Sequence, residues 1–427
     1  MQTRWILRGG RVVDPVSGRD EVSDLYIENG VLAPLPSPDA LDGIDLLPLD
    51  GLVVVPGFWD IHVHFREPGN DAAETLESGI EAAVRGGFST VVTMPNTQPP
   101  VDTPEGVQHQ IEAGRKSGQI RILPSACITH DRRGLAVADL PALAAAGAAA
   151  FTDDGSTVRD DAVMREAMQT AGRLNKPIMD HAVDPDLARG GVMHEGAVSA
   201  QLGLPGISAE AEDRMVERDI RLAEETGCAL QIQHVTTAGA VRLIRDARAR
   251  GVPVTGEATP HHLALTDTCL DGDDANFKMA PPLRAETDRQ ALLAGVADGT
   301  LQALATDHAP HRRDLKAKGF LHAPFGVVGL ETAVGVTYTH LVAAGRMSLS
   351  DWVRRWTDGP AGVLGLPAPS LRVGERADIA VLDVRSDWTV QRYTFASRSN
   401  KTPFEGVHLT GRPVAVFFGG RLVWNQM

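Results

Sequence analysis

Short apolar segments recur through the middle of this 427-residue chain, and a helix-like, often Ala-rich stretch follows each of them. The segments that we expect to be strands cover residues 53–60, 90–94, 120–126, 149–152, 177–180, 229–233, 253–258 and 301–305. Helical patterns such as 72–85, 213–226 and 238–250 lie between them. Eight such units over roughly 300 residues are typical of a (β/α)8 TIM-type barrel, an α/β fold. The alternative is an open doubly wound sheet, but no Gly-rich phosphate loop opens any of the helices.

The two ends of the chain have a different texture, in which short apolar runs alternate with turn residues. This pattern covers residues 5–14 and 24–30 near the start and residues 377–382 and 413–420 near the end. It predicts strands separated by turns. We therefore expect a small β-sandwich satellite domain built from both chain termini, residues 1–52 and 362–427, beside a barrel domain at residues 53–361.

The charge balance excludes some classes of partner. A formal net charge of −14 argues against binding to nucleic acid or to an anionic membrane, because both favour clustered Lys and Arg. No apolar run is long enough to cross a membrane, and the first residues do not read as a signal peptide, so a cytoplasmic protein is expected. Cys127, Cys228 and Cys269 lie far apart without metal-type spacing, and we expect three buried free thiols.

Candidate metal ligands follow several of the predicted strands. His62 and His64 are one residue apart at the end of the first strand, so their rings project to the same side. The others are Asp153 and Asp154 after the fourth strand, His181 after the fifth, His234 after the sixth and Asp307 after the eighth. In a barrel these strand ends converge at one mouth, where imidazole and carboxylate groups can hold divalent metal.

Five longer motifs carry a resemblance to a known family. They are His62–Gly69 (HVHFREPG), Met94–Thr97 (MPNT), Phe151–Gly155 (FTDDG), Thr306–His311 (TDHAPH) and Pro324–Gly326 (PFG). From about residue 53 to 361 the chain resembles the amidohydrolase superfamily, and more narrowly it resembles the class I dihydroorotases. The β-segments at both ends also fit this family, so the resemblance covers essentially the whole chain.

The resemblance implies a pair of zinc ions per subunit. His62, His64 and Asp307 would hold one ion, His181 and His234 the other, and Asp154 would bridge them. Many superfamily members place a carboxylated lysine at the bridge, but no lysine occurs near this strand end. A carboxylate can span two cations in the same way. Strand alternation turns Asp153 to the other side, and we expect it to support a neighbouring ligand.

The activity implied by the resemblance is that of a dihydroorotase in de novo pyrimidine (UMP) biosynthesis. This enzyme, a metal-dependent hydrolase acting on cyclic amides, interconverts N-carbamoyl-L-aspartate and L-dihydroorotate, with a metal-bridging hydroxide as nucleophile. Asp307 would be the catalytic residue that shuttles the proton. A homodimer is the family-based expectation, and association with an aspartate carbamoyltransferase is a further one.

The substrate-binding residues follow from the same motifs. Arg66, Asn96 and His311 would clamp the substrate carboxylate, because Arg binds carboxylates bidentately. Arg66 could instead pair with Glu67, and His311 could cap a loop. The substrate site would also include His64, Phe325 and Gly326. Ala280 stands where class I members carry Asn, which removes a side-chain contact to substrate.

Three alternatives remain open at this stage. Residues 312–323 form either a lid over the barrel mouth or a solvated charge cluster. The chain could be a related cyclic amidohydrolase, namely an allantoinase or a dihydropyrimidinase-type hydantoinase. It could also be an inactive partner subunit of an aspartate carbamoyltransferase, although a residue able to bind metal stands at every ligand position.

Overall fold

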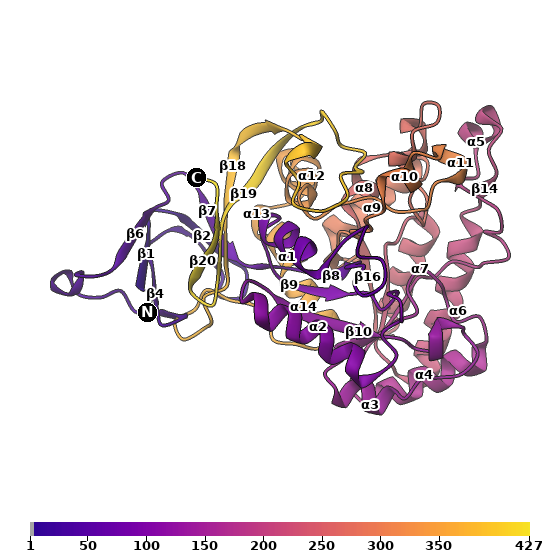
Figure 1. Cartoon of the computed structure of the whole chain (residues 1–427), viewed down its shortest axis with the longest axis horizontal. Helices are drawn as coiled ribbons and strands as arrows, with labels where there is room; N and C mark the ends of the chain where they lie inside the picture. Colours follow the sequence, from indigo (N-terminus) through magenta and orange to yellow (C-terminus); the bar gives the residue numbers. More distant parts are fainter. Residues whose placement is uncertain (1–3) are drawn as a thin grey trace.

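A closed ring of parallel strands forms the centre of the protein, for which a computed structural model describes residues 4–427. The strands are β8 (Phe58–Val63), β9 (Phe88–Thr93), β10 (Arg121–Ala126), β11 (Ala150–Phe151), β12 (Ile178–Asp180), β15 (Leu230–Ile232), β16 (Val254–Ala258) and β17 (Ala303–Leu304). They follow one another in this order in an eight-stranded sheet. The ring closes after β17, where His64 N donates to His308 O at 2.8 Å and Val63 bridges His308 in parallel. The barrel predicted from the sequence is therefore confirmed (Figure 1).

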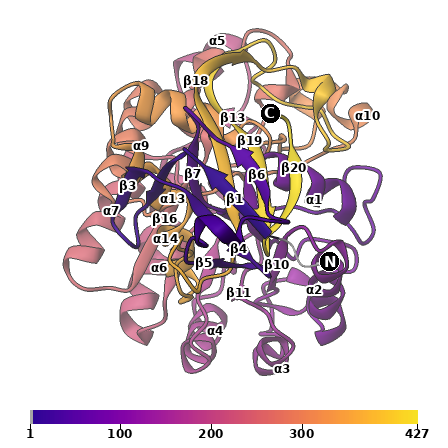
Figure 2. The same ribbon diagram turned by 90° about the vertical axis from the view of Figure 1, so that its left-hand side faces the viewer.

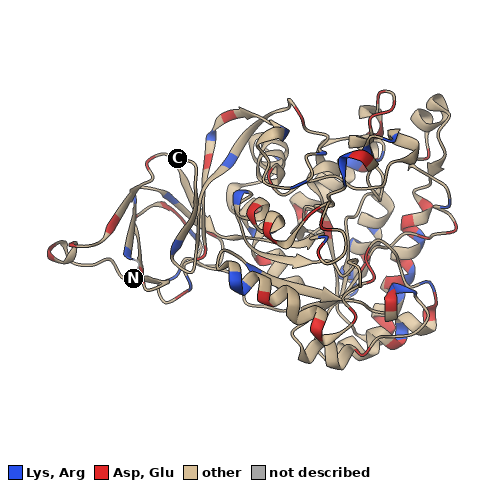
Figure 3. Ribbon diagram, in the orientation of Figure 1, with Lys and Arg blue, Asp and Glu red and all other residues tan. Residues whose placement is uncertain are grey.

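Helices surround the ring (Figures 1 and 2). The longer ones are α1 (Leu76–Arg85), α2 (Pro104–Ser117), α4 (Asp161–Arg173), α6 (Glu210–Thr226), α7 (Ala238–Ala249), α9 (Glu286–Asp298) and α13 (Leu349–Trp356). The shorter ones are α3 (Leu140–Ala145), α5 (Ala197–Leu202), α8 (Pro260–Ala264), α10 (Arg313–Lys316), α11 (Gly319–His322), α12 (Ala333–Thr337) and α14 (Asp358–Val363). Acidic and basic residues lie mainly on these outer elements, whereas the barrel strands are mostly uncharged (Figure 3).

Local sequence explains where several helices begin and end. Thr75 caps α1 by accepting from Ser78 N, and Thr237 caps α7 by accepting from Ala240 N. Pro104 occupies the first turn of α2, where its missing N–H has no cost. The same helix ends at Gly118 with φ 60°, a left-handed conformation that suits glycine.

Two further sheets are built from the ends of the chain, and the larger of them contains strands from both ends. A four-stranded sheet has the order β5 (Val31–Ala33), β4 (Leu25–Glu28), β1 (Arg4–Arg8), β6 (Asp45–Pro48). A six-stranded sheet has the order β20 (Arg421–Asn425), β19 (His408–Phe418), β18 (Ile379–Thr389), β7 (Val53–Pro56), β2 (Arg11–Asp14), β3 (Arg19–Val22). Leu7 and Ile27 of the first sheet share a buried apolar cluster with Val54, Ile379 and Phe417 of the second. Figure 2 views the molecule from the side of these sheets.

The first predicted strand, residues 53–60, is in fact two strands. β7 pairs with β2 and β18 in the six-stranded sheet, while β8 begins the barrel at Phe58. The chain passes from one sheet to the other at Gly57, where a Cβ atom would lie 2.5 Å from Ser89 Oγ. The sequence did not predict this break, because both strands are buried and form one continuous apolar run. Periodicity in such a run does not show where one strand ends and the next begins.

Two expectations from composition can be compared with the structure. All three cysteines are free, and Cys127 and Cys228 are buried, whereas Cys269 is half-buried, so the prediction of burial is wrong for Cys269. Among residues 4–427, no helix is both long enough and apolar enough to span a membrane.

Candidate metal centre

The polar side chains at the ends of the barrel strands meet in one buried cluster. His62 lies within β8, and the other members follow their strands: His64, Asp154, His181, His234 and Asp307. Two triads have ligand atoms within 4.8 Å of one another, and these are His62, His64, Asp154 and Asp154, His181, His234. Asp154 belongs to both triads, which is the position that a bridging ligand requires.

Each Asp154 oxygen faces imidazole nitrogens. Oδ1 lies 3.3 Å from His62 Nε2, 3.7 Å from His181 Nδ1 and 3.8 Å from His234 Nε2. Oδ2 lies 3.4 Å from His64 Nε2. Asp307 Oδ1 joins the cluster at 3.1 Å from His64 Nε2 and 3.6 Å from His62 Nε2.

The cluster contains buried atoms that lack a hydrogen-bond partner among the described residues. They are His62 Nε2, Asp154 Oδ1 and His234 Nδ1. Unpaired buried polar atoms are costly, and native proteins rarely leave them without a ligand or other partner. Imidazole nitrogen and carboxylate oxygen are the donors that zinc and similar divalent cations bind, so these residues fit a metal site.

Hydrogen bonds behind the cluster orient two of the rings. His62 Nδ1 donates to Glu257 Oε1 at 2.6 Å, and His64 Nδ1 donates to Asn96 Oδ1 at 2.9 Å. Both rings therefore present the Nε2 lone pair to the cluster, as metal-binding histidines do. Glu257 also accepts from His234 N at 3.1 Å. Sequence reasoning missed Glu257, although an acidic residue near the end of the seventh strand could have suggested it.

The backbone is strained at two of the cluster residues. His234 has φ 31° and Asp307 has φ 46°, values that non-glycine residues rarely adopt. Such conformations cost about 1–3 kcal/mol each and occur where the surrounding structure enforces them, often at functional sites.

The electrostatics favour ionised carboxylates around a charged His62 ring. Burial acts to lower the pKa of His62, but Asp154, Glu257 and Asp307 raise it well above its usual value. Burial alone raises the pKa of Asp154, but the His62 and His181 rings hold that pKa well below its usual range. Burial also raises the pKa of Asp307, but His62 and His64 together lower that pKa below its usual range. Burial, with His181 nearby, holds the pKa of His234 well below its usual value. Metal ligands must be deprotonated, so Asp154, Asp307 and His234 already have the charge state that a cation needs, whereas a cation bound at His62 would displace the proton of that ring.

Asp153 takes a different role from the predicted one. Its carboxylate accepts from Ile128 N at 2.9 Å, from Thr129 N at 3.1 Å and from Thr129 Oγ1. It thus fixes the backbone that follows β10 and does not contact a neighbouring cluster residue. The expected ligand-supporting role is not seen, because the hydrogen bonds of this carboxylate among the described residues all go to the loop after β10.

A cavity of about 350 Å³ opens beside the cluster. Except for the fully buried His62, it is lined by every predicted site residue: His64, Arg66, Asn96, Asp154, His181, His234, Ala280, Asp307, His311, Phe325 and Gly326. The structure therefore brings the whole predicted set to one place.

The sequence left open whether Arg66 pairs with Glu67 and whether His311 caps a loop, and the hydrogen bonds of these residues bear on both questions. Among the described residues Arg66 forms no ion pair with Glu67, and Glu67 Oε2 instead accepts from Leu76 N at 2.9 Å. Arg66 Nε donates to Pro310 O at 3.2 Å, and the guanidinium forms no ion pair with a described residue. His311 Nε2 donates to Phe325 O at 2.6 Å, and burial together with Arg66 lowers the pKa of His311 to about 3.

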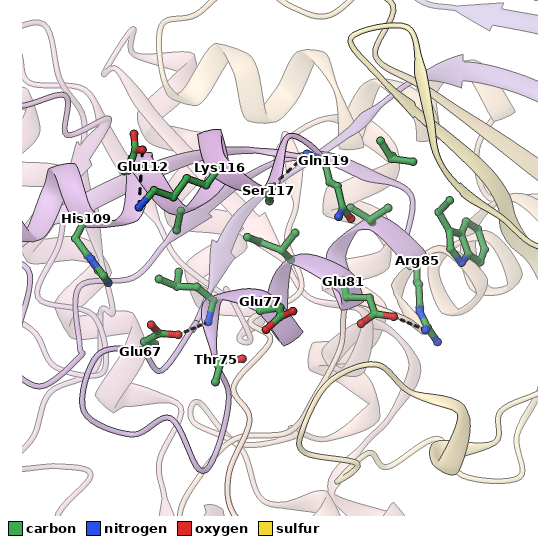
Figure 4. A pocket seen from close by; sticks show the side chains of 16 residues that line it. Glu67, Thr75, Glu77, Glu81, Arg85, His109, Glu112, Lys116, Ser117 and Gln119 are labelled. Atoms are coloured by element: carbon green, nitrogen blue, oxygen red, sulfur yellow. Dashed lines mark hydrogen bonds and ion pairs between the residues drawn. The ribbon is translucent and has the colours of Figure 1, made fainter. Parts of the chain in front are cut away.

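A larger cavity, of about 770 Å³, lies away from the cluster (Figure 4). Side chains of α1 and α2 line it together with Val423 and Trp424 of β20. Its charged residues include the ion pair between Arg85 and Glu81. None of the cluster residues lines this cavity, so cavity size does not identify the chemical site here.

Comparisons with known proteins show the family to which this chain is similar. Residues 51–240 match the family model described as dihydro-orotase-like. A protein of Pelotomaculum thermopropionicum named dihydroorotase is 47% identical over 99% of this chain and 99% of its own length. One of Geobacillus sp. with the same name is 43% identical, again over 99% of both chains.

Solved structures of similar fold are also known. The L-hydantoinase (dihydropyrimidinase) from Arthrobacter aurescens has a TM-score of 0.83 at 25% identity and covers 100% of this chain and 97% of that one. The dihydropyrimidinase from Brevibacillus agri has a TM-score of 0.84 at 23% identity over 100% of this chain and 96% of that one.

Proposed function

The chain belongs to the dihydroorotase family, and from this premise we propose that it is a class I dihydroorotase. It catalyses the reversible cyclisation of N-carbamoyl-L-aspartate to L-dihydroorotate with loss of water, a step of pyrimidine biosynthesis. The observation that carries the proposal is the position of Arg66, an unpaired guanidinium in the same cavity as a complete His and Asp cluster. A cyclic amide that bears a carboxylate fits both features.

We infer that the cluster holds two zinc ions per subunit. His62, His64 and Asp307 are assigned to one ion and His181 and His234 to the other, with Asp154 between them. The two triads that share Asp154 support this assignment. Bound divalent cations would supply an acidified water molecule and an electrophilic contact for the amide carbonyl oxygen.

Asp307 is assigned to proton transfer. Its pKa lies below the usual range, so the carboxylate is ionised at neutral pH and can accept a proton. In hydrolysis a C–O bond forms as the ring C–N bond breaks, and Asp307 carries the proton from the attacking water to the leaving nitrogen. In cyclisation the same carboxylate removes a proton from the ureido nitrogen as that atom attacks the side-chain carboxyl group.

Arg66 and Asn96 are assigned to the substrate carboxylate. The terminal nitrogens of Arg66 can bind an anion bidentately, since its Nε is the atom that bonds to Pro310. Asn96 Oδ1 accepts from His64, which leaves the amide N–H groups for the substrate. His311 differs, because its Nε2–H is used by Phe325 O and the ring is neutral. It therefore offers a lone pair, and we assign it to a substrate N–H.

Ala280, Phe325 and Gly326 complete the substrate site of the proposal. Ala280 lines the cavity but offers only a methyl group there, so any polar contact at this position comes from backbone. The two terminal sheets, which share an apolar cluster, support a β-sandwich satellite domain built from both ends of the chain beside the barrel domain. Because β7 belongs to the six-stranded sheet, the first boundary of this proposal lies at Gly57 and not between residues 52 and 53. A cytoplasmic homodimer, with association to an aspartate carbamoyltransferase, remains the family-based expectation.

The proposal is tested by comparing substrates on the purified wild-type protein. Hydrolysis of dihydroorotate should exceed that of dihydrouracil by at least about tenfold in kcat/KM, because dihydrouracil lacks the carboxylate that Arg66 binds. Allantoin should be a poor substrate as well. A preference for dihydrouracil would favour the second candidate, a hydantoinase-type hydrolase, which the structural likeness to the Arthrobacter aurescens enzyme makes worth testing.

A further inference from the structure

Lys316 lies in α10, in the segment that the sequence predicts to be either a lid or a solvated charge cluster. Its side chain is neither solvated nor at the surface, because Lys316 is only 4% exposed. Lys318, two residues later, is exposed to solvent. The chain therefore buries one lysine of this charged segment and leaves its neighbour in water.

The buried ammonium group is surrounded by backbone carbonyls. Lys316 Nζ donates to Gly326 O at 2.8 Å, to Pro324 O at 3.2 Å and to Lys278 O at 3.3 Å. Among the described residues no carboxylate pairs with it. Burial and the nearby Lys278 lower the pKa of Lys316 to about 7. A buried cation without an acidic partner is costly, and the three oriented carbonyl dipoles offset part of that cost.

These carbonyls belong to two segments that are far apart in the sequence. Lys278 O also accepts from Gly326 N at 3.0 Å, so the two segments already touch. The Lys278 side chain reaches back to Leu321 O at 3.0 Å and lies 4.6 Å from the centre of the Phe325 ring. Lys316 thus joins residues 278–280 to residues 324–326.

Both segments form part of the cavity beside the metal centre. Ala280, Phe325 and Gly326 line it. Pro324 and Gly326, whose carbonyls Lys316 binds, flank Phe325, and the carbonyl of Phe325 in turn accepts from His311 Nε2 at 2.6 Å. The orientation of His311 in the cavity therefore depends on a backbone that Lys316 holds.

We propose that Lys316 is a positioning residue for substrate, whose ammonium group fixes residues 278–280 and 324–326 as one wall of the cavity and thereby orients His311. This inference rests on the proposed dihydroorotase function for the identity of the substrate. The carbonyl cage itself does not depend on that function.

The test compares Lys316→Met with Lys318→Met. Methionine keeps an unbranched side chain one atom shorter than that of lysine but donates no hydrogen bond, whereas the control removes a charge from the same segment at an exposed position. In Lys316→Met, hydrogen–deuterium exchange should rise in peptides covering residues 276–284 and 320–328. KM for dihydroorotate should rise by at least about tenfold, with kcat within about threefold of wild type and metal content unchanged. Lys318→Met should match wild type throughout.

Three other results would overturn the proposal or part of it. Unchanged exchange in Lys316→Met would rule out the cage, and increased exchange with an unchanged KM would rule out the positioning role. A loss of metal and of kcat at constant KM would assign Lys316 to the metal centre instead. If Lys316→Met does not fold, Lys316→Gln, which keeps an amide donor, should show the same changes at smaller size. If wild type and Lys318→Met both fail to hydrolyse dihydroorotate, the proposed function is wrong. The exchange measurement then still shows whether Lys316 holds the two segments together, and KM is measured on the substrate that the protein does hydrolyse.

Discussion

The terminal sheets and the mouth of the barrel are built on opposite principles. Between the two sheets, apolar side chains such as Ile27, Val54 and Phe417 are buried against one another. At the mouth, by contrast, ionisable side chains are equally buried, some of their atoms are unpaired, and His234 and Asp307 have strained backbones. The sheets thus bury apolar area, which stabilises the fold, whereas the mouth has unpaired atoms and backbone strain that cost stability, as is typical of functional sites.

The largest effect on activity is expected when the carboxylate that both triads share at the barrel mouth is removed. Asp154→Ala should lose the metal pair and most of the activity, because both triads contain Asp154. The fold should remain, since this side chain contributes ionic groups to the mouth and not to an apolar core. Metal analysis, turnover and circular dichroism measure the three quantities. Unchanged metal content and rate would remove Asp154 from the bridge.

A smaller loss is expected when proton transfer alone is removed. Asp307→Asn keeps the size and one coordinating oxygen but does not cycle a proton at neutral pH. Turnover should fall by at least about 10²-fold, the usual contribution of general acid–base catalysis, with metal still bound. Near-normal kcat in a metal-loaded Asn variant would contradict the assigned role.

The next effect concerns substrate recognition and leaves the metals untouched. Arg66→Met should lower kcat/KM for dihydroorotate by at least about tenfold, because the carboxylate loses charge-assisted hydrogen bonds. Any residual activity on dihydrouracil should change little. Equal losses on both substrates would mean that Arg66 supports the fold or the metal centre.

The smallest effect on activity is expected from a substitution between the two terminal sheets. Val54→Ala leaves a cavity between the terminal sheets and should lower the free energy of unfolding by about 1–3 kcal/mol. The kcat of the folded protein should remain at the wild-type value. Urea unfolding with activity measured in the native baseline separates the two quantities, and a large fall in kcat would show that the sheets and the mouth are coupled.

The sequence alone predicted the features that depend on local pattern. The eight barrel strands follow from short apolar runs, and the cluster residues follow from polar side chains at the ends of those runs. The break at Gly57 could not be predicted, because it depends on the close approach of Ser89 from another strand. Glu257 and Lys316 were missed for a related reason: their roles depend on partners far away in the sequence, His62 and the carbonyl of Lys278.

The central claim is that the converging strand ends hold metal that this chain needs to hydrolyse dihydroorotate. The most direct measurement is the metal content and dihydroorotate turnover of one preparation before chelation, after chelation and after zinc is restored. We expect about two zinc ions per subunit, loss of turnover when they are removed, and recovery of turnover when they return. Undiminished turnover in the metal-free protein would contradict the account.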